Sequence, residues 1–126
     1  MPNINAALGL AQLEQIDSKV EMKRSLFDAY SNAFSGIRGI SIFKEPPNSR
    51  SNYWLHSIVL EKNDERFLNA ILKASNEAGI ATRPTWKLIN ELIPYKKNPA
   101  MNLDGALSIS NRLINIPSSP NLAGAK

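Results

Sequence analysis

The sequence predicts an α+β fold, a two-layer sandwich in which helices cover one face of a small, mostly antiparallel sheet. Apolar residues recur at helical spacing over residues 5–34, which indicates a long N-terminal helix. Short stretches rich in β-branched and aromatic residues follow, each bounded by glycine, proline or asparagine. A second helical pattern lies between these stretches, so strands and helices alternate along the chain. The 126 residues suffice for one domain.

The first element is predicted as one helix from Asn5 to about Phe34. Its start, residues 6–11, is small and apolar nearly all round, which indicates burial against a partner. The later part is amphipathic, with an apolar face formed by Leu13, Ile16, Val20, Phe27, Tyr30 and Phe34. Asn3 is a candidate N-cap. A helix of this length exceeds what a small sheet needs, so we expect it to pack on something beyond this chain.

The remaining elements are shorter. Strands are predicted at residues 40–43, 53–61, 80–83 and 113–116. A helix from Asn63, its candidate cap, to about Ala78 should bury one apolar face. That face consists of Phe67, Leu68, Ile71, Leu72 and Ala74. The other segments are expected to be helical turns at 86–92, a polar connection at 94–102, a short helix at 103–111 and a frayed end at 121–126.

Composition argues against several classes of function. The chain has no cysteine, which excludes disulfides and thiolate metal sites and fits the cytoplasm, where we place the protein. No apolar run approaches the ~20 residues of a membrane span, and the N-terminus lacks a secretion signal, so we expect no membrane partner. The net charge of +4 would suit nucleic acid, but the basic residues are scattered without interleaved aromatics. We therefore expect no nucleic-acid partner.

The sequence carries no complete catalytic apparatus. Its one histidine, His56, lies in a predicted strand, where we expect a packed or half-exposed side chain. It has no Ser-His-acid set around it. No cluster of metal ligands and no glycine-rich phosphate loop is present. We predict no catalytic residue and no metal site in this chain.

The most unusual stretch is residues 82–86, Thr-Arg-Pro-Thr-Trp. Arg83 stands at the end of a predicted strand, and arginine binds carboxylates and phosphates through paired hydrogen bonds. Trp86 can stack on rings. These residues can therefore form the rim of a pocket. The residues alone leave a second interpretation open, in which Trp86 anchors a loop to the core and Arg83 is solvated.

Four segments carry a resemblance over nearly the whole chain. They are residues 1–14, Tyr53-Trp54, residues 79–86 and residues 114–119. In sequence, order and spacing they resemble the C-terminal domain of sugar-nucleotide aminotransferases of the DegT/StrS type. The form of residues 83–86 and 113–119 is similar to that of members that make amino sugars for bacterial surface glycans.

The resemblance implies that residues 1–126 are the small domain of the aspartate aminotransferase fold (type I), without the catalytic large domain. It implies pyridoxal phosphate as cofactor of the full-length enzyme and transfer of an amino group from glutamate to a nucleotide-linked keto-deoxysugar, for surface polysaccharide biosynthesis. In the family the cofactor's lysine lies upstream, so we expect this chain to bind no cofactor and to be inactive alone. The family is dimeric, so the first helix is expected to form a homodimer interface.

The resemblance also places individual residues. Asn3 and Asn5 fall at the cleft or interface, although helix capping is an alternative for each. Arg83 and Trp86 fall in a substrate-side loop, where Arg83 would meet a carboxylate or phosphate and Trp86 would line the sugar side. Asn90 stands where many relatives have a histidine, which puts a proton-transfer role there in doubt. A non-catalytic association module or remnant, and a small basic nucleic-acid binder, remain as alternatives.

Overall fold

The computed structural model describes residues 1–124, which form two compact units. The first unit combines residues 1–33 and 45–54 with the C-terminal segment from Ser118. The second unit comprises residues 34–44 and 55–117. Each unit is therefore assembled from segments that lie far apart in the sequence. No helix within residues 1–124 is both long and apolar enough to cross a bilayer.

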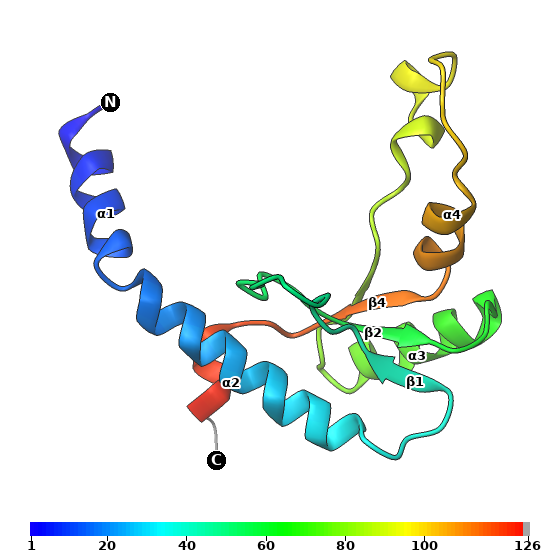
Figure 1. Cartoon of the computed structure of the whole chain (residues 1–126), viewed down its shortest axis with the longest axis horizontal. Helices are drawn as coiled ribbons and strands as arrows, with labels where there is room; N and C mark the ends of the chain where they lie inside the picture. The colour runs from blue at the N-terminus through cyan, green and yellow to red at the C-terminus, as the bar shows by residue number, and fades with distance from the viewer. Residues whose placement is uncertain (125–126) are drawn as a thin grey trace. The chain divides into compact units, whose positions relative to one another are not determined.

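Two helices occupy the N-terminal part of the first unit, where one was predicted (Figure 1). They are α1 (Asn3–Leu13) and α2 (Ile16–Phe34). The expectation of a single helix is wrong because the Gln15 amide bonds the Gln12 carbonyl at 3.3 Å, three residues back, which tightens the turn and interrupts the α-helical ladder. The prediction of Asn3 as N-cap is also wrong. Pro2 occupies the cap position, without a side-chain cap hydrogen bond.

The core of the first unit lies between α2 and the loop at residues 45–54. Leu26 and Phe27 on the helix and Tyr53 on the loop are buried. The predicted apolar face of the helix is confirmed at Phe27, but Leu13 is exposed. Val20, Tyr30 and Phe34 are half-buried, in agreement with the prediction, and Leu26, which the prediction lacked, is also buried.

Two neighbouring basic residues of α2, Lys23 and Arg24, bind the other segments of this unit. The Lys23 ammonium donates to the carbonyl oxygens of Tyr53 at 3.2 Å, Trp54 at 2.9 Å and Ser118 at 2.7 Å. The Arg24 guanidinium binds both carboxylate oxygens of Glu45, at 2.8 and 3.2 Å, and the Ser51 carbonyl at 2.7 Å. Burial lowers the pKa of Lys23, whereas the hydrogen bonds that Arg24 donates to Glu45 raise the pKa of Arg24. These contacts join the helix to the loop and to the C-terminal segment.

The second unit is built on a four-stranded antiparallel sheet in the order β1-β2-β4-β3. The strands are β1 (Ile40–Ile42), β2 (His56–Leu60), β3 (Arg83–Pro84) and β4 (Leu113–Ile116). The predicted α+β class and small antiparallel sheet are confirmed. The core consists of Ile58, Leu60, Leu68, Ile114 and Ile116. His56 is only 1% exposed, opposite Ile116 in the sheet, and is therefore a packed strand residue.

Two strand boundaries differ from the prediction for backbone reasons. Strand β2 begins at His56 instead of Tyr53, because Tyr53 has a positive φ of 46°, which no strand residue adopts. Strand β3 includes Pro84, which was expected to stop it. Proline is tolerated there because β3 is an edge strand, whose outer side has no neighbouring strand that needs a backbone N–H donor.

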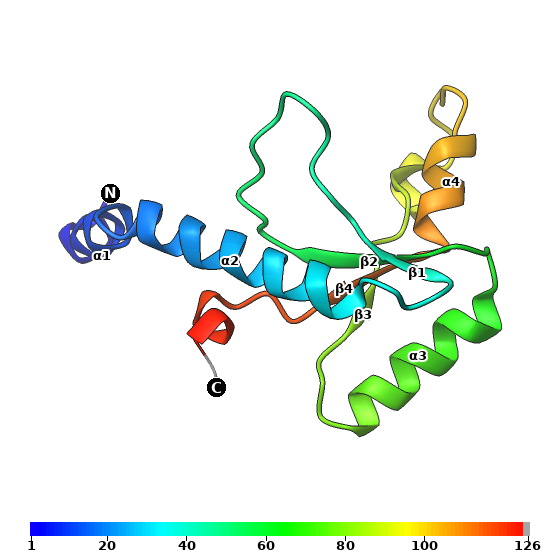
Figure 2. The ribbon, with the colours of Figure 1, turned by 60° about the horizontal axis from the view of Figure 1, so that its bottom comes forward.

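Helix α3 (Glu65–Glu77) lies along one face of the sheet (Figure 2). Its cap is Asp64 and not Asn63, since the Asp64 carboxylate accepts from the amides of Arg66 and Phe67. Of its predicted apolar face, Leu68 is buried and Phe67 is exposed. Ala74 is also exposed, whereas Ile71 and Leu72 are half-buried. The four short strands therefore cover only a narrow part of this helix.

The remaining elements are short. They are the 3-10 turns η1 (Ile89–Glu91) and η2 (Ile93–Tyr95), helix α4 (Asp104–Ser110) and the turn η3 (Pro120–Gly124). The prediction of a frayed end is wrong for residues 121–124, which belong to η3, and residues 125–126 lie outside the described part of the chain.

Candidate functional site

The strand that carries Arg83 is fixed on one side by α3. The side-chain amide of Asn76 donates to the Thr82 carbonyl at 3.1 Å and to the Thr82 hydroxyl at 3.0 Å. That hydroxyl also lies 2.5 Å from the Ser75 hydroxyl. Thr82 is buried, so these hydrogen bonds are shielded from water. The residue immediately before Arg83 is therefore held in place by the last turn of α3.

The sheet fixes the other side of the same segment. Asn115 is the β4 partner of Arg83, and its side-chain amide donates to the Pro84 carbonyl at 3.3 Å. The Ser57 hydroxyl donates to the Asn115 side-chain oxygen at 2.8 Å, which orients that amide. The Thr85 hydroxyl donates to the Ser110 carbonyl at 3.0 Å. Residues 82, 84 and 85 are thus each anchored by a different element.

Arg83 and Trp86 project from this anchored backbone. Arg83 is exposed, and no hydrogen bond or ion pair involves its guanidinium within residues 1–124. Trp86 is 67% exposed, so it does not anchor the loop in the core as the alternative interpretation held. A rigid backbone that carries an available guanidinium and an exposed indole can bind an anion or a ring without reorganisation.

Trp86 borders a hollow of about 350 Å³ beside the start of α3. Lys87, Glu65, Asn69 and Asn111 also line it, whereas Arg83 does not. The structure therefore places the two predicted substrate-binding residues on one segment but not in one hollow.

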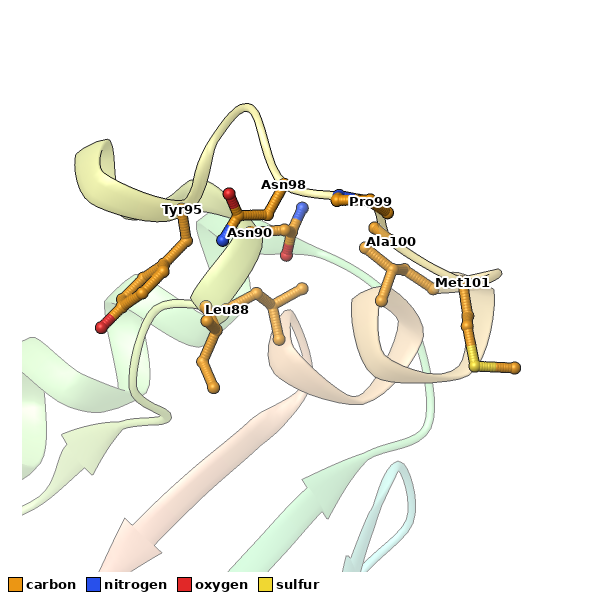
Figure 3. A pocket seen from close by; sticks show the side chains of 9 residues that line it. Leu88, Asn90, Tyr95, Asn98, Pro99, Ala100 and Met101 are labelled. Carbon is orange, nitrogen blue, oxygen red and sulfur yellow. The ribbon is translucent and has the colours of Figure 1, made fainter.

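A larger cavity of about 450 Å³ lies further along the same loop, between residues 88 and 103. Its polar groups are the side chains of Asn90, Tyr95 and Asn98. Its apolar walls are formed by Leu88, Ile89, Pro99, Ala100, Met101 and Leu103. Tyr95 and Met101 lie at opposite ends of the cavity, with the two asparagine amides side by side between them (Figure 3).

Tight turns create this cavity. The amide of Glu91 bonds the Leu88 carbonyl at 2.9 Å, and the amide of Asn98 bonds the Tyr95 carbonyl at 3.0 Å. These turns fold residues 98–103 back toward residues 88–90. The cavity was not predicted, because residues 94–102 were expected to form a polar connection. The apolar residues Leu88 and Ile89 before that stretch and Met101 within it were the available signal.

Asn3 and Asn5 lie in the first turn of α1, in the other unit. Both are exposed, and neither side chain makes a hydrogen bond within the described residues 1–124. The apolar residues around them are also exposed. Ile4 is 78% exposed and Leu8 64%, and α1 has no buried residue.

The sheet, helix α3 and the Arg83 segment together form a small α+β unit. Over residues 1–126 the chain matches the DegT/DnrJ/EryC1/StrS aminotransferase family, and it belongs to that family.

Two curated relatives show the level of similarity. The chain is 31% identical to GDP-perosamine synthase of Vibrio cholerae over 125 residues, which cover 97% of this chain and 33% of that protein. It is 34% identical over 87 residues to the putative pyridoxal phosphate-dependent aminotransferase EpsN of Bacillus subtilis, covering 69% of this chain and 22% of EpsN. The chain thus spans about a third or less of the length of these relatives.

Solved structures share the fold. The PLP form of the putative sugar aminotransferase Spr1654 from Streptococcus pneumoniae superposes with a TM-score of 0.80 at 25% identity, covering 94% of this chain and 31% of that one. AtS13 from Actinomadura melliaura gives a TM-score of 0.79 at 21% identity, covering 95% of this chain and 31% of that one.

The described residues show no lysine that is committed to pyridoxal phosphate. The cofactor needs a lysine whose amine is available in an enclosed site. The Lys23 ammonium donates to three backbone carbonyls, so its amine is not available to the cofactor. No chemical step through the cofactor can therefore be assigned to these residues.

Proposed function

We propose that this chain is the C-terminal small domain of a cytoplasmic, pyridoxal phosphate-dependent sugar-nucleotide aminotransferase. The complete enzyme would transfer an amino group from glutamate to a keto-deoxysugar carried on a nucleotide, for surface polysaccharide biosynthesis. The observation that carries this proposal is the family match over residues 1–126, which corresponds to about a third of the relatives' length. Relatives named as GDP-perosamine synthases and a solved relative in PLP and PMP forms support the substrate class and the cofactor.

Within that enzyme, this chain would bind and enclose substrate and would not carry the cofactor. Arg83 would bind a carboxylate or phosphate, because its guanidinium is exposed and its backbone is anchored on both sides. Trp86 would contact the sugar. Asn3 and Asn5 would lie at the cleft or subunit interface, and the exposed apolar residues of α1 would form a homodimer contact.

Cofactor loading tests the proposal. The 126-residue chain and the polypeptide encoded by the same reading frame extended upstream are each incubated with pyridoxal phosphate and glutamate. We expect the extended polypeptide to acquire a lysine-bound chromophore and to aminate a nucleotide-linked keto-sugar, whereas the short chain should do neither. Covalent cofactor and transaminase activity in the short chain would disprove the proposal that this chain does not carry the cofactor.

A non-catalytic association module is the second candidate function. The observation that favours it is the exposure of the apolar residues of α1. This candidate predicts self-association or partner binding without any transaminase activity in the extended polypeptide. The activity assay therefore separates the two candidates directly.

A further inference from the structure

The cavity between residues 88 and 103 is lined by no charged side chain among the described residues. A diphosphate or a glutamate carboxylate would find no opposite charge along its walls. The cavity therefore suits an uncharged part of a ligand. Any anionic part of the same ligand would have to lie outside it.

The walls of the cavity favour a flat ring. Its volume of about 450 Å³ falls within the range of roughly 300–1,000 Å³ that is usual for small-molecule sites. Leu88, Ile89, Pro99 and Met101 contribute apolar side chains. A hexose presents hydroxyl groups around its whole ring, and these apolar side chains offer them no hydrogen-bond partner. A nucleobase has two apolar faces and confines its polar atoms to an edge.

Two amides are available for that polar edge. The side chains of Asn90 and Asn98 come from η1 and from the turn after η2, and they lie side by side in the cavity (Figure 3). Neither makes a side-chain hydrogen bond within residues 1–124. An asparagine amide offers a donor and an acceptor, which match the paired donor and acceptor on a base edge.

Resting on the proposed function, we propose that this cavity receives the nucleobase of the nucleotide-linked sugar. Asn90 and Asn98 bind the edge of the base, and the apolar walls contact its faces. The cavity thereby recognises the nucleotide through a group that takes no part in the amino transfer.

Side-chain amide NMR of the ¹⁵N-labelled 126-residue chain tests this assignment. The probes are thymidine, uridine and inosine, which carry a base but no phosphate. We expect at least one of them to shift the Asn90 and Asn98 amide signals saturably, with a dissociation constant on the order of millimolar, since a lone nucleoside has few atoms to bind with. Free glucose and inorganic pyrophosphate should leave both signals unchanged.

Variants localise the effect. Asn90→Ala and Asn98→Ala should each weaken nucleoside binding about three- to tenfold, as expected for one lost hydrogen bond. Ala100→Trp should abolish binding by filling the cavity. The matched control is Asn121→Ala, which removes an exposed asparagine in η3 and should leave affinity unchanged. Should Ala100→Trp fail to fold, the two asparagine variants still decide the question.

Three results would overturn the assignment. The first is the absence of any shift with all three nucleosides, and the second is a shift of the same amides by glucose or pyrophosphate instead. The third is a shift that depends only on protein concentration, which would assign the cavity to a contact between copies of the chain. The readout needs no catalysis. If no nucleoside binds but the extended polypeptide transaminates, only this inference is rejected. If a nucleoside binds but the extended polypeptide does not transaminate, only the proposed function is rejected.

Discussion

The rings of Phe27 and Tyr53 are stacked, with centroids 4.3 Å apart and planes inclined by 14°. Phe27 belongs to α2, whereas Tyr53 belongs to the loop and has a positive φ of 46°. A bulky residue in this conformation costs about 1–3 kcal/mol and persists only where its surroundings enforce it. Here the ring stack, together with the Lys23 bond to the Tyr53 carbonyl, holds the strained residue in place.

Replacement of Phe27 should therefore destabilise the first unit through the lost burial and through the lost ring stack. Phe27→Ala should lower the free energy of unfolding by about 3–5 kcal/mol. Phe27→Leu retains apolar volume but removes the stack, so we expect a loss of about 1 kcal/mol. Urea unfolding measures both. Phe67→Ala is the control. Phe67 is about half exposed, so its removal should lower the free energy of unfolding less than Phe27→Ala does. Equal losses at Phe27 and Phe67 would contradict the argument.

Lys23 should matter through its three carbonyl partners and not through its charge. Lys23→Met keeps the aliphatic stem but leaves the carbonyls of Tyr53, Trp54 and Ser118 without this donor, so we expect a loss of about 1–3 kcal/mol. Amide exchange at residues 118–124 should also increase, because the C-terminal segment loses this bond. Lys73→Met is the matched control, since its side chain is exposed and only faces Glu77. A Lys23→Met protein as stable as Lys73→Met would exclude this role.

The alkaline dependence of stability should follow two tyrosines. Burial raises the pKa of Tyr30 and Tyr53, and at Tyr53 it outweighs the lowering by the Glu45 backbone. The folded protein thus keeps protons that the unfolded chain releases above about pH 10, so this stabilisation is present below that pH and is lost as pH rises through the folded pKa values. The lowered pKa of Lys23 acts in the opposite sense, since its contribution is present above the unfolded pKa and is lost as pH falls.

Tyr30→Phe and Tyr53→Phe should therefore flatten the fall in unfolding free energy at alkaline pH, whereas Lys23→Met should steepen it. Urea unfolding at several pH values from about 8 to 11 measures these slopes. An unchanged slope in the double tyrosine variant would show that other groups control the alkaline transition.

The sequence predicted the elements whose patterns are local. Ile40–Ile42, His56–Leu60 and Leu113–Ile116 alternate or run as β-branched residues, and all three form strands close to their predicted positions. The break at Gln15 was not predictable in the same way, because no glycine or proline marks it. It coincides with a single 3-10 hydrogen bond between Gln15 and Gln12, and neither residue type predicts such a bond.

The candidate site likewise combines residues that the sequence can indicate with contacts that only the folded chain creates. Arg83 and Trp86 could be named as candidates from the sequence, because arginine and tryptophan beside a strand-ending proline are an uncommon combination of residues. The anchors that fix them could not, since Asn76 and Asn115 lie on other elements and meet residues 82–84 only in the folded chain. Likewise, Asn90 and Asn98 share a cavity only because two tight turns reverse the chain between them.

The Asn115 anchor yields a prediction for the Arg83 segment. Asn115→Ala should increase amide exchange at residues 83–86, because the Pro84 carbonyl loses its side-chain donor and the cross-strand Ser57 bond disappears. Ser57→Ala removes only the second of these bonds and should have a smaller effect. In the extended polypeptide, Asn115→Ala should raise the KM for the anionic substrate that Arg83 is proposed to bind. Exchange rates that respond equally to both variants would show that Ser57, not Asn115, fixes the segment.

The exposed apolar residues of α1 predict self-association of the 126-residue chain. Ile4, Leu8, Leu10 and Leu13 are each at least 60% exposed, and burial of each such side chain in a contact would gain about 1.5–3 kcal/mol. We expect sedimentation equilibrium to show a concentration-dependent dimer, and Leu8→Glu to shift it toward monomer at least tenfold, because a carboxylate at this position would be buried unpaired. Ile80→Glu is the control, since Ile80 is a comparably exposed apolar residue outside α1. A strict monomer at high concentration, or equal effects of both substitutions, would remove α1 as the association surface.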